Sequence, residues 1–123
     1  MHGRHTFSKA ERLQYGHQFR AVYERGRALR GRLVVVCVLE EPPAGTAATR
    51  AVGIVTSRKV GIAVQRNRAR RLLRETWRLN KHQLKTNLQI VLIARAAIQG
   101  KSFAEVQAEV VALFKAAGLV VES

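Results

Sequence analysis

The residue type in this sequence that is best suited to bind a ligand is arginine. Many of its arginines lie in one segment. Residues 64–78, VQRNRARRLLRETWR, contain six arginines and a single carboxylate, that of Glu75. A guanidinium presents a planar fork of N–H donors that matches a phosphate, and it also stacks on bases. Like charges one helical turn apart repel each other, so an ordinary solvent-facing helix mixes the two signs. The pattern favours a phosphate-binding surface for nucleic acid.

The charge of the whole chain also indicates a polyanionic partner. Its 123 residues include 22 Lys and Arg against 8 Asp and Glu, which gives a formal net charge of +14. Self-repulsion of this size destabilises a compact monomer unless a polyanion neutralises it. Nucleic acid is the favoured partner, and an anionic membrane surface is the weaker alternative. The longest apolar run, LVVVCVL at 33–39, is too short to span a bilayer.

Side chains suited to catalysis or metal binding are scarce. The chain has no aspartate and its eight glutamates are scattered, whereas a two-metal nuclease needs several converging carboxylates. The four histidines lack the spacing of a zinc site. Cys37 lies inside an apolar run with no identifiable base beside it. We therefore expect no catalytic residue and no metal ligand in this chain. The lone cysteine excludes an internal disulfide and fits a cytoplasmic location.

The arginines must be positioned by an alternating series of helices and strands. Periodicity predicts helices over 8–24, 63–79 and 103–117, the first and last opened by capping-box pairs, Ser8 with Glu11 and Ser102 with Glu105. Strands are predicted over 32–41, 51–57 and 88–94, the first two as a hairpin. The order αββαβα predicts one α+β domain over 1–123, with three or four strands covered by helices and flexible ends at 1–7 and 119–123.

The central helix is predicted to have one apolar and one basic face. At about 100° per residue, Ala69, Leu72, Leu73 and Thr76 share the apolar face. Trp77 falls at the border of the two faces and is expected to be a packing anchor. The basic face comprises Asn67, Arg70, Arg71, Arg74 and Arg78, with Arg66 and Arg68 flanking it.

The segment TSRKVGIAVQRNRARRLLRE at 56–75 strongly resembles the signature of the bacterial ribonuclease P protein component. Ser57, Arg58, Lys59, Val60 and Gly61 match its first half, and Arg66, Asn67, Arg68, Arg70, Arg71 and Arg74 match its second half. The resemblance extends to FRAVYERG at 19–26 and IVLIAR at 90–95. It implies an αβββαβα fold like the second domain of ribosomal small-subunit protein five, with a left-handed βαβ crossover.

The resemblance also implies a function. In that family an RNA subunit holds Mg²⁺ and cleaves precursor tRNA to give the mature 5′ end, while the protein binds the RNA and the 5′ leader. The residues expected to contact the catalytic RNA are Arg58, Lys59, Arg66, Asn67, Arg68, Arg70, Arg71 and Arg74. The residues expected to line the leader cleft are Phe19, Tyr23 and Cys37.

Some positions leave alternatives open. Phe19 could belong to the core as readily as to the cleft, whereas the polar tip of Tyr23 favours the cleft. Cys37, Ile62 and Ala96 depart from the family pattern, which often has an aromatic, an asparagine and a basic residue there. A ribosomal RNA-binding protein would lack the 56–75 signature. A nuclease in its own right would need catalytic groups that this chain lacks.

Overall fold

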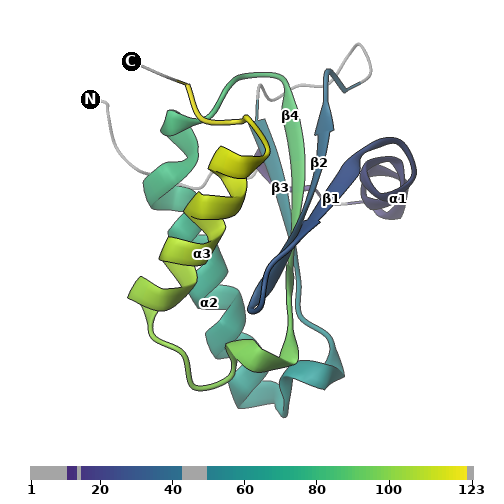
Figure 1. The fold of residues 1–123 in the computed structure, drawn as a ribbon. Coiled ribbons are helices and arrows are strands. Elements are labelled where there is room, and N and C mark those ends of the chain that lie inside the picture. The colour runs from purple at the N-terminus through teal and green to yellow at the C-terminus, as the bar shows by residue number, and fades with distance from the viewer. Residues whose placement is uncertain (1–10, 14, 43–49, 122–123) are drawn as a thin grey trace.

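Four strands form one sheet in which the order of strands differs from their order along the chain. A computed structural model describes the chain except for residues 1–10, 14, 43–49 and 122–123. The sheet order is β1-β2-β4-β3, and only β3 and β4 run parallel (Figure 1). The strands are β1 Arg27–Arg30, β2 Val34–Glu40, β3 Arg50–Val55 and β4 Leu88–Ala94. The helices are α1 Gly16–Arg25, α2 Ala63–Asn80 and α3 Phe103–Ala116.

The α+β class is confirmed, with the order αβββαβα that the resemblance implies rather than the αββαβα read from the residues. The missed strand is β1, RALR, which is too short and too charged to give a strand pattern. The predicted hairpin of the first two strands was also wrong. β4, the sequence LQIVLIA, lies between β2 and β3 because its continuous apolar run is best buried at the centre of a sheet.

The helix boundaries agree with the sequence except at the start of α1. That helix begins at Gly16, well after the expected cap at Ser8, which lies outside the described residues. At α3 the predicted capping box is confirmed. The Glu105 backbone N–H donates to Ser102 Oγ at 3.1 Å, and the Ser102 N–H donates to Glu105 Oε2 at 2.8 Å. The segment at 58–61, expected as a turn, is a short 3₁₀ helix, η2 Arg58–Val60.

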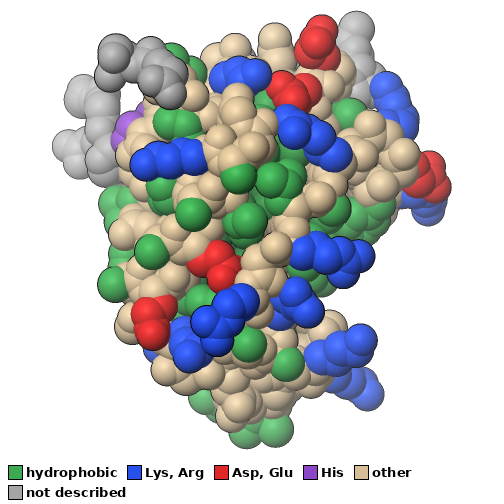
Figure 2. Space-filling model, viewed as in Figure 1, with side chains coloured by type: hydrophobic (Ala, Val, Ile, Leu, Met, Phe, Trp, Pro, Cys, Tyr) green, Lys and Arg blue, Asp and Glu red, His purple; other side chains and the backbone are tan. Residues whose placement is uncertain are grey.

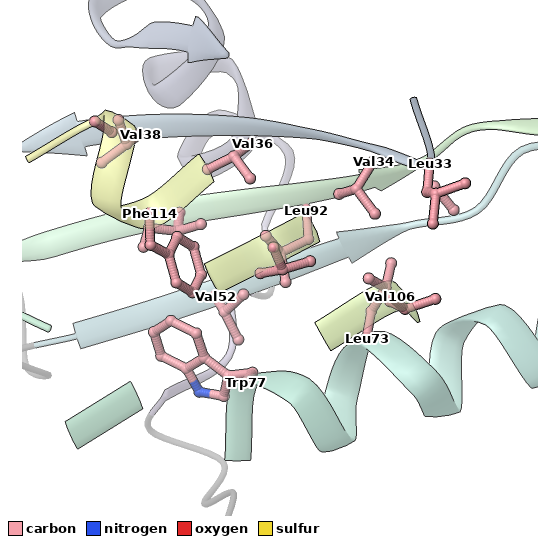
Figure 3. Close-up of a cluster of buried hydrophobic side chains, with 14 of the residues drawn as sticks. Leu33, Val34, Val36, Val38, Val52, Leu73, Trp77, Leu92, Val106 and Phe114 are labelled. Carbon is pink, nitrogen blue, oxygen red and sulfur yellow. The ribbon is translucent and has the colours of Figure 1, made fainter. Parts of the chain in front are cut away.

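The main core lies between one face of the sheet and the pair α2 and α3 (Figures 1 and 3). Trp77 and Leu73 of α2 and Phe114 of α3 point toward the strands, and each is at most 1% exposed. The indole Nε1–H of Trp77 donates to Glu11 Oε1 at 3.4 Å. The expected role of Trp77 as a packing anchor is confirmed. Truncating such a side chain costs about 3–5 kcal/mol.

The opposite face of the sheet is covered less completely. Among the described residues, α1, a helix of 10 residues, packs on it through Val22 and the ring of Phe19, and Leu13 of the preceding segment is also buried there. Its smaller cluster includes Cys37 of β2 and Val91 of β4. The sheet therefore has one fully buried face and one partly covered face.

The end of the described chain is packed, in contrast to the flexible tail expected from residue 119. Leu119 is fully buried, and its carbonyl accepts from the Lys85 N–H at 2.8 Å. The Val121 N–H donates to the Gln83 carbonyl at 2.8 Å. Leu119 and Val120 explain this packing, because they join the core after Gly118 turns the chain with a φ of 74°.

The turn between β1 and β2 is held to α3 by one carboxylate. Glu109 accepts hydrogen bonds from the backbone N–H groups of Arg32, Leu33 and Val34 at 3.0, 2.7 and 2.8 Å. These donors precede or begin β2 and would otherwise lack a protein partner. Glu109 thus joins the edge hairpin to the helix layer.

Replacement of Glu109 by Ala is expected to lower the free energy of unfolding by about 1–3 kcal/mol, because two partly buried donors and one exposed donor lose their acceptor. Urea denaturation followed by circular dichroism measures the change. Glu109→Gln keeps one acceptor oxygen and should give a smaller loss. Glu24→Ala, an exposed acid on α1, is the control and should change stability by less than about 0.5 kcal/mol. Equal stability of Glu109→Ala and Glu24→Ala would contradict this role.

Candidate nucleic-acid interface

The position of α2 in the core decides where its arginines point. Ala69, Leu73 and Thr76 are buried against the sheet, so the basic side chains must leave the helix on its other sides. Arg70 leaves on the side of β3. Its Nη2 donates to Thr56 Oγ1 at 2.7 Å and its Nη1 donates to Asn67 Oδ1 at 3.0 Å. These bonds fix the basic flank of α2 next to the end of β3.

Arg68 is placed apart from the other arginines of the signature. It lies two residues before Arg70, roughly 200° around the helix. Its half-buried guanidinium donates to the backbone carbonyl of Lys101 at 2.7 Å, just before α3. Arg68 therefore joins α2 to the start of α3, and the structure does not bring it together with Arg70 and Arg74.

Several predicted RNA-binding side chains remain available. In the part of the chain that the structure describes, none of the following makes a side-chain hydrogen bond or ion pair: Arg58, Lys59, Arg66, Arg71 and Arg74. All of these except Arg66 are exposed. Arg78, by contrast, is paired with Glu75, whose pKa is lowered by the hydrogen bond from Arg78. The single acid of the segment thus neutralises the last arginine and leaves the others to bind an anion.

Surface charge is distributed unevenly around the molecule. Figure 2 looks onto the α3 side, where basic side chains gather along the right-hand margin and acidic ones lie scattered. In Figure 1, which has the same view, the sheet lies toward this margin and α2 and α3 lie on the opposite side. Glu40 is an acid whose charge is compensated, because it pairs with Arg27 at 2.9 Å and with Lys85 at 3.2 Å.

A hollow at the outer edge of β3 joins the basic flank of α2 to α1. It is lined by Arg12, Phe19 and Gly53 together with Arg70 and Arg74. The Phe19 ring lies so close to Gly53 that a Cβ there would be 2.4 Å from Phe19 Cε1. Phe19 is therefore half-buried on the sheet and also reaches the hollow, so it combines the two roles that the sequence left open.

The other two predicted cleft residues differ in exposure. The Tyr23 side chain is 48% exposed, whereas Cys37 is only 6% exposed beneath α1. Burial raises the pKa of the Cys37 thiol, and it also raises the pKa of the Tyr23 hydroxyl. Both groups are therefore neutral near pH 7, and Cys37 lacks the thiolate that a nucleophile requires.

Arg12 and Thr56 belong to this surface although the sequence analysis did not select them. Arg12 reaches the hollow because its segment pairs with the edge of β3, where the Leu13 N–H donates to the Val52 carbonyl at 3.0 Å. An isolated bridge of this kind, between Arg12 and Val52, leaves no periodic pattern in the sequence from which it could be predicted. Thr56 starts the 56–75 signature, and its hydroxyl could have been considered as an acceptor for an arginine of α2.

Neither a metal site nor a membrane span is found among the described residues. No group of three or more His, Cys, Asp or Glu side chains comes together there. No helix in the same ranges combines the length and apolar character needed to cross a bilayer.

Comparison with known proteins gives a consistent result. The model of a family described as ribonuclease P matches residues 7–118. The ribonuclease P protein component of Symbiobacterium thermophilum is 45% identical over 112 residues, covering 91% of this chain and 95% of the relative. That of Clostridium acetobutylicum is 36% identical over 113 residues, covering 92% and 93%. The solved RNase P protein of Staphylococcus aureus superimposes with a TM-score of 0.79 at 26% identity, covering 92% of this chain and 100% of that one. The RNase P protein of Thermotoga maritima gives 0.74 at 27%, covering 92% and 99%.

Substitution of Arg68 and of Arg74 should have different effects on stability. Arg68→Ala removes the donor to the Lys101 carbonyl and is expected to lower the free energy of unfolding by about 1–2 kcal/mol. Arg74→Ala removes an exposed side chain without a protein partner and should change it by less than about 0.5 kcal/mol. Urea midpoints of the two variants, measured side by side, test the assignment. Equal midpoints would mean that Arg68 has no structural role.

Proposed function

The chain belongs to the ribonuclease P protein family, and from this premise we propose that it binds the catalytic RNA of ribonuclease P and the 5′ leader of precursor tRNA. In this role it assists the Mg²⁺-dependent cleavage that gives the mature 5′ end of tRNA. The proposal places the protein in the cytoplasm, where this RNA and its substrates are made. The observation that carries it is that Arg66, Arg71 and Arg74 have no side-chain partner among the described residues, on a helix whose other face is buried in the core.

The catalytic RNA is proposed to bind the basic flank of α2 together with η2. Arg66, Arg71 and Arg74 of α2 and Arg58 and Lys59 of η2 offer cations that no described acid neutralises. Arginine suits this surface because its forked donors can hold two phosphate oxygens at once. The helix is held against the core, so the backbone positions of these cations are fixed before binding and only their side chains must be ordered.

The leader is proposed to bind in the cleft between α1 and the partly covered sheet face. Unpaired RNA is bound through aromatic rings that stack on its bases and through cations that hold its backbone. Tyr23 offers an exposed ring on α1, and Phe19 offers a ring edge beside Arg70 and Arg74. Cys37, deeper in the cleft, supplies apolar surface instead of the aromatic ring that the family often has.

Cleavage itself is assigned to the RNA subunit, which would also hold most of the Mg²⁺. The absence of aspartate and the scattered glutamates leave the protein without a set of carboxylates for two metal ions. The contribution of the protein is electrostatic. Its cations screen the RNA phosphates, so that the folded RNA and its metal sites form at a lower Mg²⁺ concentration.

Reconstitution with the cognate RNA tests this proposal. Precursor tRNA is incubated with protein alone, with RNA alone, and with both, across a Mg²⁺ series. We expect no cleavage by the protein alone, cleavage by the RNA at high Mg²⁺, and a lower Mg²⁺ requirement for the complex. Cleavage by highly purified protein without RNA would make the protein a nuclease in its own right. If the complex and the RNA alone require the same Mg²⁺ concentration, the proposed electrostatic role of the protein is wrong.

The salt dependence of RNA binding tests the α2 surface directly. Arg74→Ala is expected to flatten the slope of log affinity against log salt by about one unit or less, because one phosphate contact and its released counterion are lost. Lys115→Ala in the last turn of α3 removes an equal charge away from this flank and is the control. Filter binding at a series of KCl concentrations measures both slopes. If the two variants behave alike, Arg74 does not contact the RNA.

A further inference from the structure

Residues 11–13 form a short segment along the outer edge of β3, which we call the strap. Arg12 forms an isolated parallel bridge with Val52, and the Leu13 N–H donates to the Val52 carbonyl at 3.0 Å. A segment with few backbone hydrogen bonds has low local stability. The position of the strap therefore depends on what its side chains contact.

The two ends of the strap are anchored on opposite faces of the sheet. Leu13 is 7% exposed and packs in the smaller cluster beneath α1. Glu11 reaches the helix layer on the other face, where its Oε1 accepts from the Trp77 indole Nε1–H at 3.4 Å and also from Lys81 Nζ. The side chains of Glu11 and Lys81 are 16% and 14% exposed, so water screens this ion pair less than one on the open surface.

The partners of Glu11 belong to a row of side chains along α2. The row comprises Arg70, Arg74, Trp77 and Lys81. Their spacing of three or four residues places them on one side of the helix. Arg12, the residue between the two anchors, lines the hollow at the edge of β3 that Arg70 and Arg74 also line. The strap therefore lies along this row, with Glu11 beside its buried end and Arg12 beside its cationic end.

The charge of Arg12 makes its position unfavourable unless another contact holds it. Placing it at a hollow that Arg70 and Arg74 already line brings like charges together in the free protein. Glu11 holds the strap without neutralising this cluster, because its carboxylate is paired with Lys81 at the other end of the row. The cations are then already assembled when an anion arrives, so less ordering is needed on binding.

We infer that Glu11 is a positioning residue for RNA binding, which acts by holding Arg12 at the hollow where Arg12, Arg70 and Arg74 bind one phosphate of an RNA strand. This inference rests on the proposed RNA-binding function. It gives a role in binding a polyanion to an acid that lies outside the 56–75 signature. The phosphate belongs to the catalytic RNA or to the leader, and the test distinguishes these two sources.

The sign of the effect of Glu11→Ala on RNA affinity separates positioning from simple charge. Removing an acid raises a net charge that is already +14, which by itself strengthens binding to a polyanion. We expect the opposite, a loss of about threefold to tenfold, as for one exposed charge-assisted contact. Glu24→Ala removes an exposed acid of α1 and is the control, which should bind at least as tightly as the wild type. Equal or tighter binding by Glu11→Ala would overturn the inference.

Two binding measurements identify the source of the phosphate. Filter binding gives the affinity of each variant for the catalytic RNA. The reconstituted holoenzyme gives the affinities for precursor tRNA and for mature tRNA. A loss toward the catalytic RNA assigns the phosphate to that RNA, whereas a loss toward the precursor alone assigns it to the leader.

A double-mutant cycle tests whether Glu11 acts through Arg12. If it does, Glu11→Ala costs no further affinity in a chain that already carries Arg12→Ala, because the contact that it positions is absent. Additive losses would show that Glu11 affects RNA binding by another route, and they would overturn the inference.

Hydrogen exchange of the Leu13 amide measures in the free protein whether the strap is held. Glu11→Ala should accelerate this exchange about tenfold to a hundredfold, since a charge-assisted contact no longer opposes local opening. The Leu92 amide in the buried strand β4 should exchange as in the wild type. Unchanged exchange at Leu13, or equal acceleration at Leu92, would mean that Glu11 does not hold the strap specifically.

Reversal of the ion pair provides a second variant. Glu11→Lys places a cation beside Lys81 and should release the strap, and adding Lys81→Glu restores a pair of opposite charges. We expect the double variant to bind RNA more tightly than Glu11→Lys alone. Net charge predicts the reverse order, because Glu11→Lys is the more basic chain. The reverse order would therefore contradict the positioning role.

The outcome separates this inference from the proposed function. If the wild type binds RNA and Glu11→Ala binds it at least as tightly, Glu11 does not position Arg12, although the protein is an RNA-binding subunit. If the wild type neither binds the catalytic RNA nor raises the affinity of the holoenzyme for the precursor, the proposed function itself is wrong and the positioning role falls with it.

Discussion

The burial of one sheet face under α2 and α3 is the constraint on which the other features of this protein depend. Leu73 and Trp77 must point into that core, so the arginines of the same helix must point away from it. Among the described residues, the second face receives Leu13 and the short helix α1, which do not cover it completely. One packing arrangement therefore produces both a rigid basic helix and a partly open apolar sheet face. Both surfaces are formed by helices and strands that also build the core, so a chain of 123 residues needs no additional element for either.

The arginines of this protein have different partners, which the sequence does not distinguish. Some bind the chain's own backbone, as Arg68 binds the Lys101 carbonyl and Arg50 the Leu84 carbonyl at 2.9 Å. A carbonyl satisfies the donors of a guanidinium but does not cancel its charge. Others pair with glutamates, as Arg78 does with Glu75, whereas Arg58, Arg71 and Arg74 have no side-chain partner among the described residues. The chain's own acids therefore leave a net charge of +14. A polyanion is the partner that removes this repulsion.

Sequence reasoning succeeded where one periodic pattern determined the outcome. The bounds of β4, the apolar face of α2 and the Ser102 capping box depend on residues close in the chain, and they were predicted correctly. It failed where distant segments compete for the same partner. Whether β3 pairs with β2 or with β4 is decided by the whole sheet, and the four residues of β1 become a strand only because β2 is beside them. For the same reason the sequence predicted a basic face on α2 but could not place Arg68 against α3.

The central place of β4 has a consequence for how the protein is made. β1 and β2 pair locally, but among the described strands β3 pairs with β4 alone. During synthesis from the N-terminus, β3 and the arginine-rich helix emerge from the ribosome before residues 88–94 do. Until then the sheet is incomplete, and the cations of α2 are not fixed to a core. The nascent chain thus acquires the arrangement proposed to bind RNA only when most of its length has been translated. The reason is that β3 cannot pair until β4 has emerged.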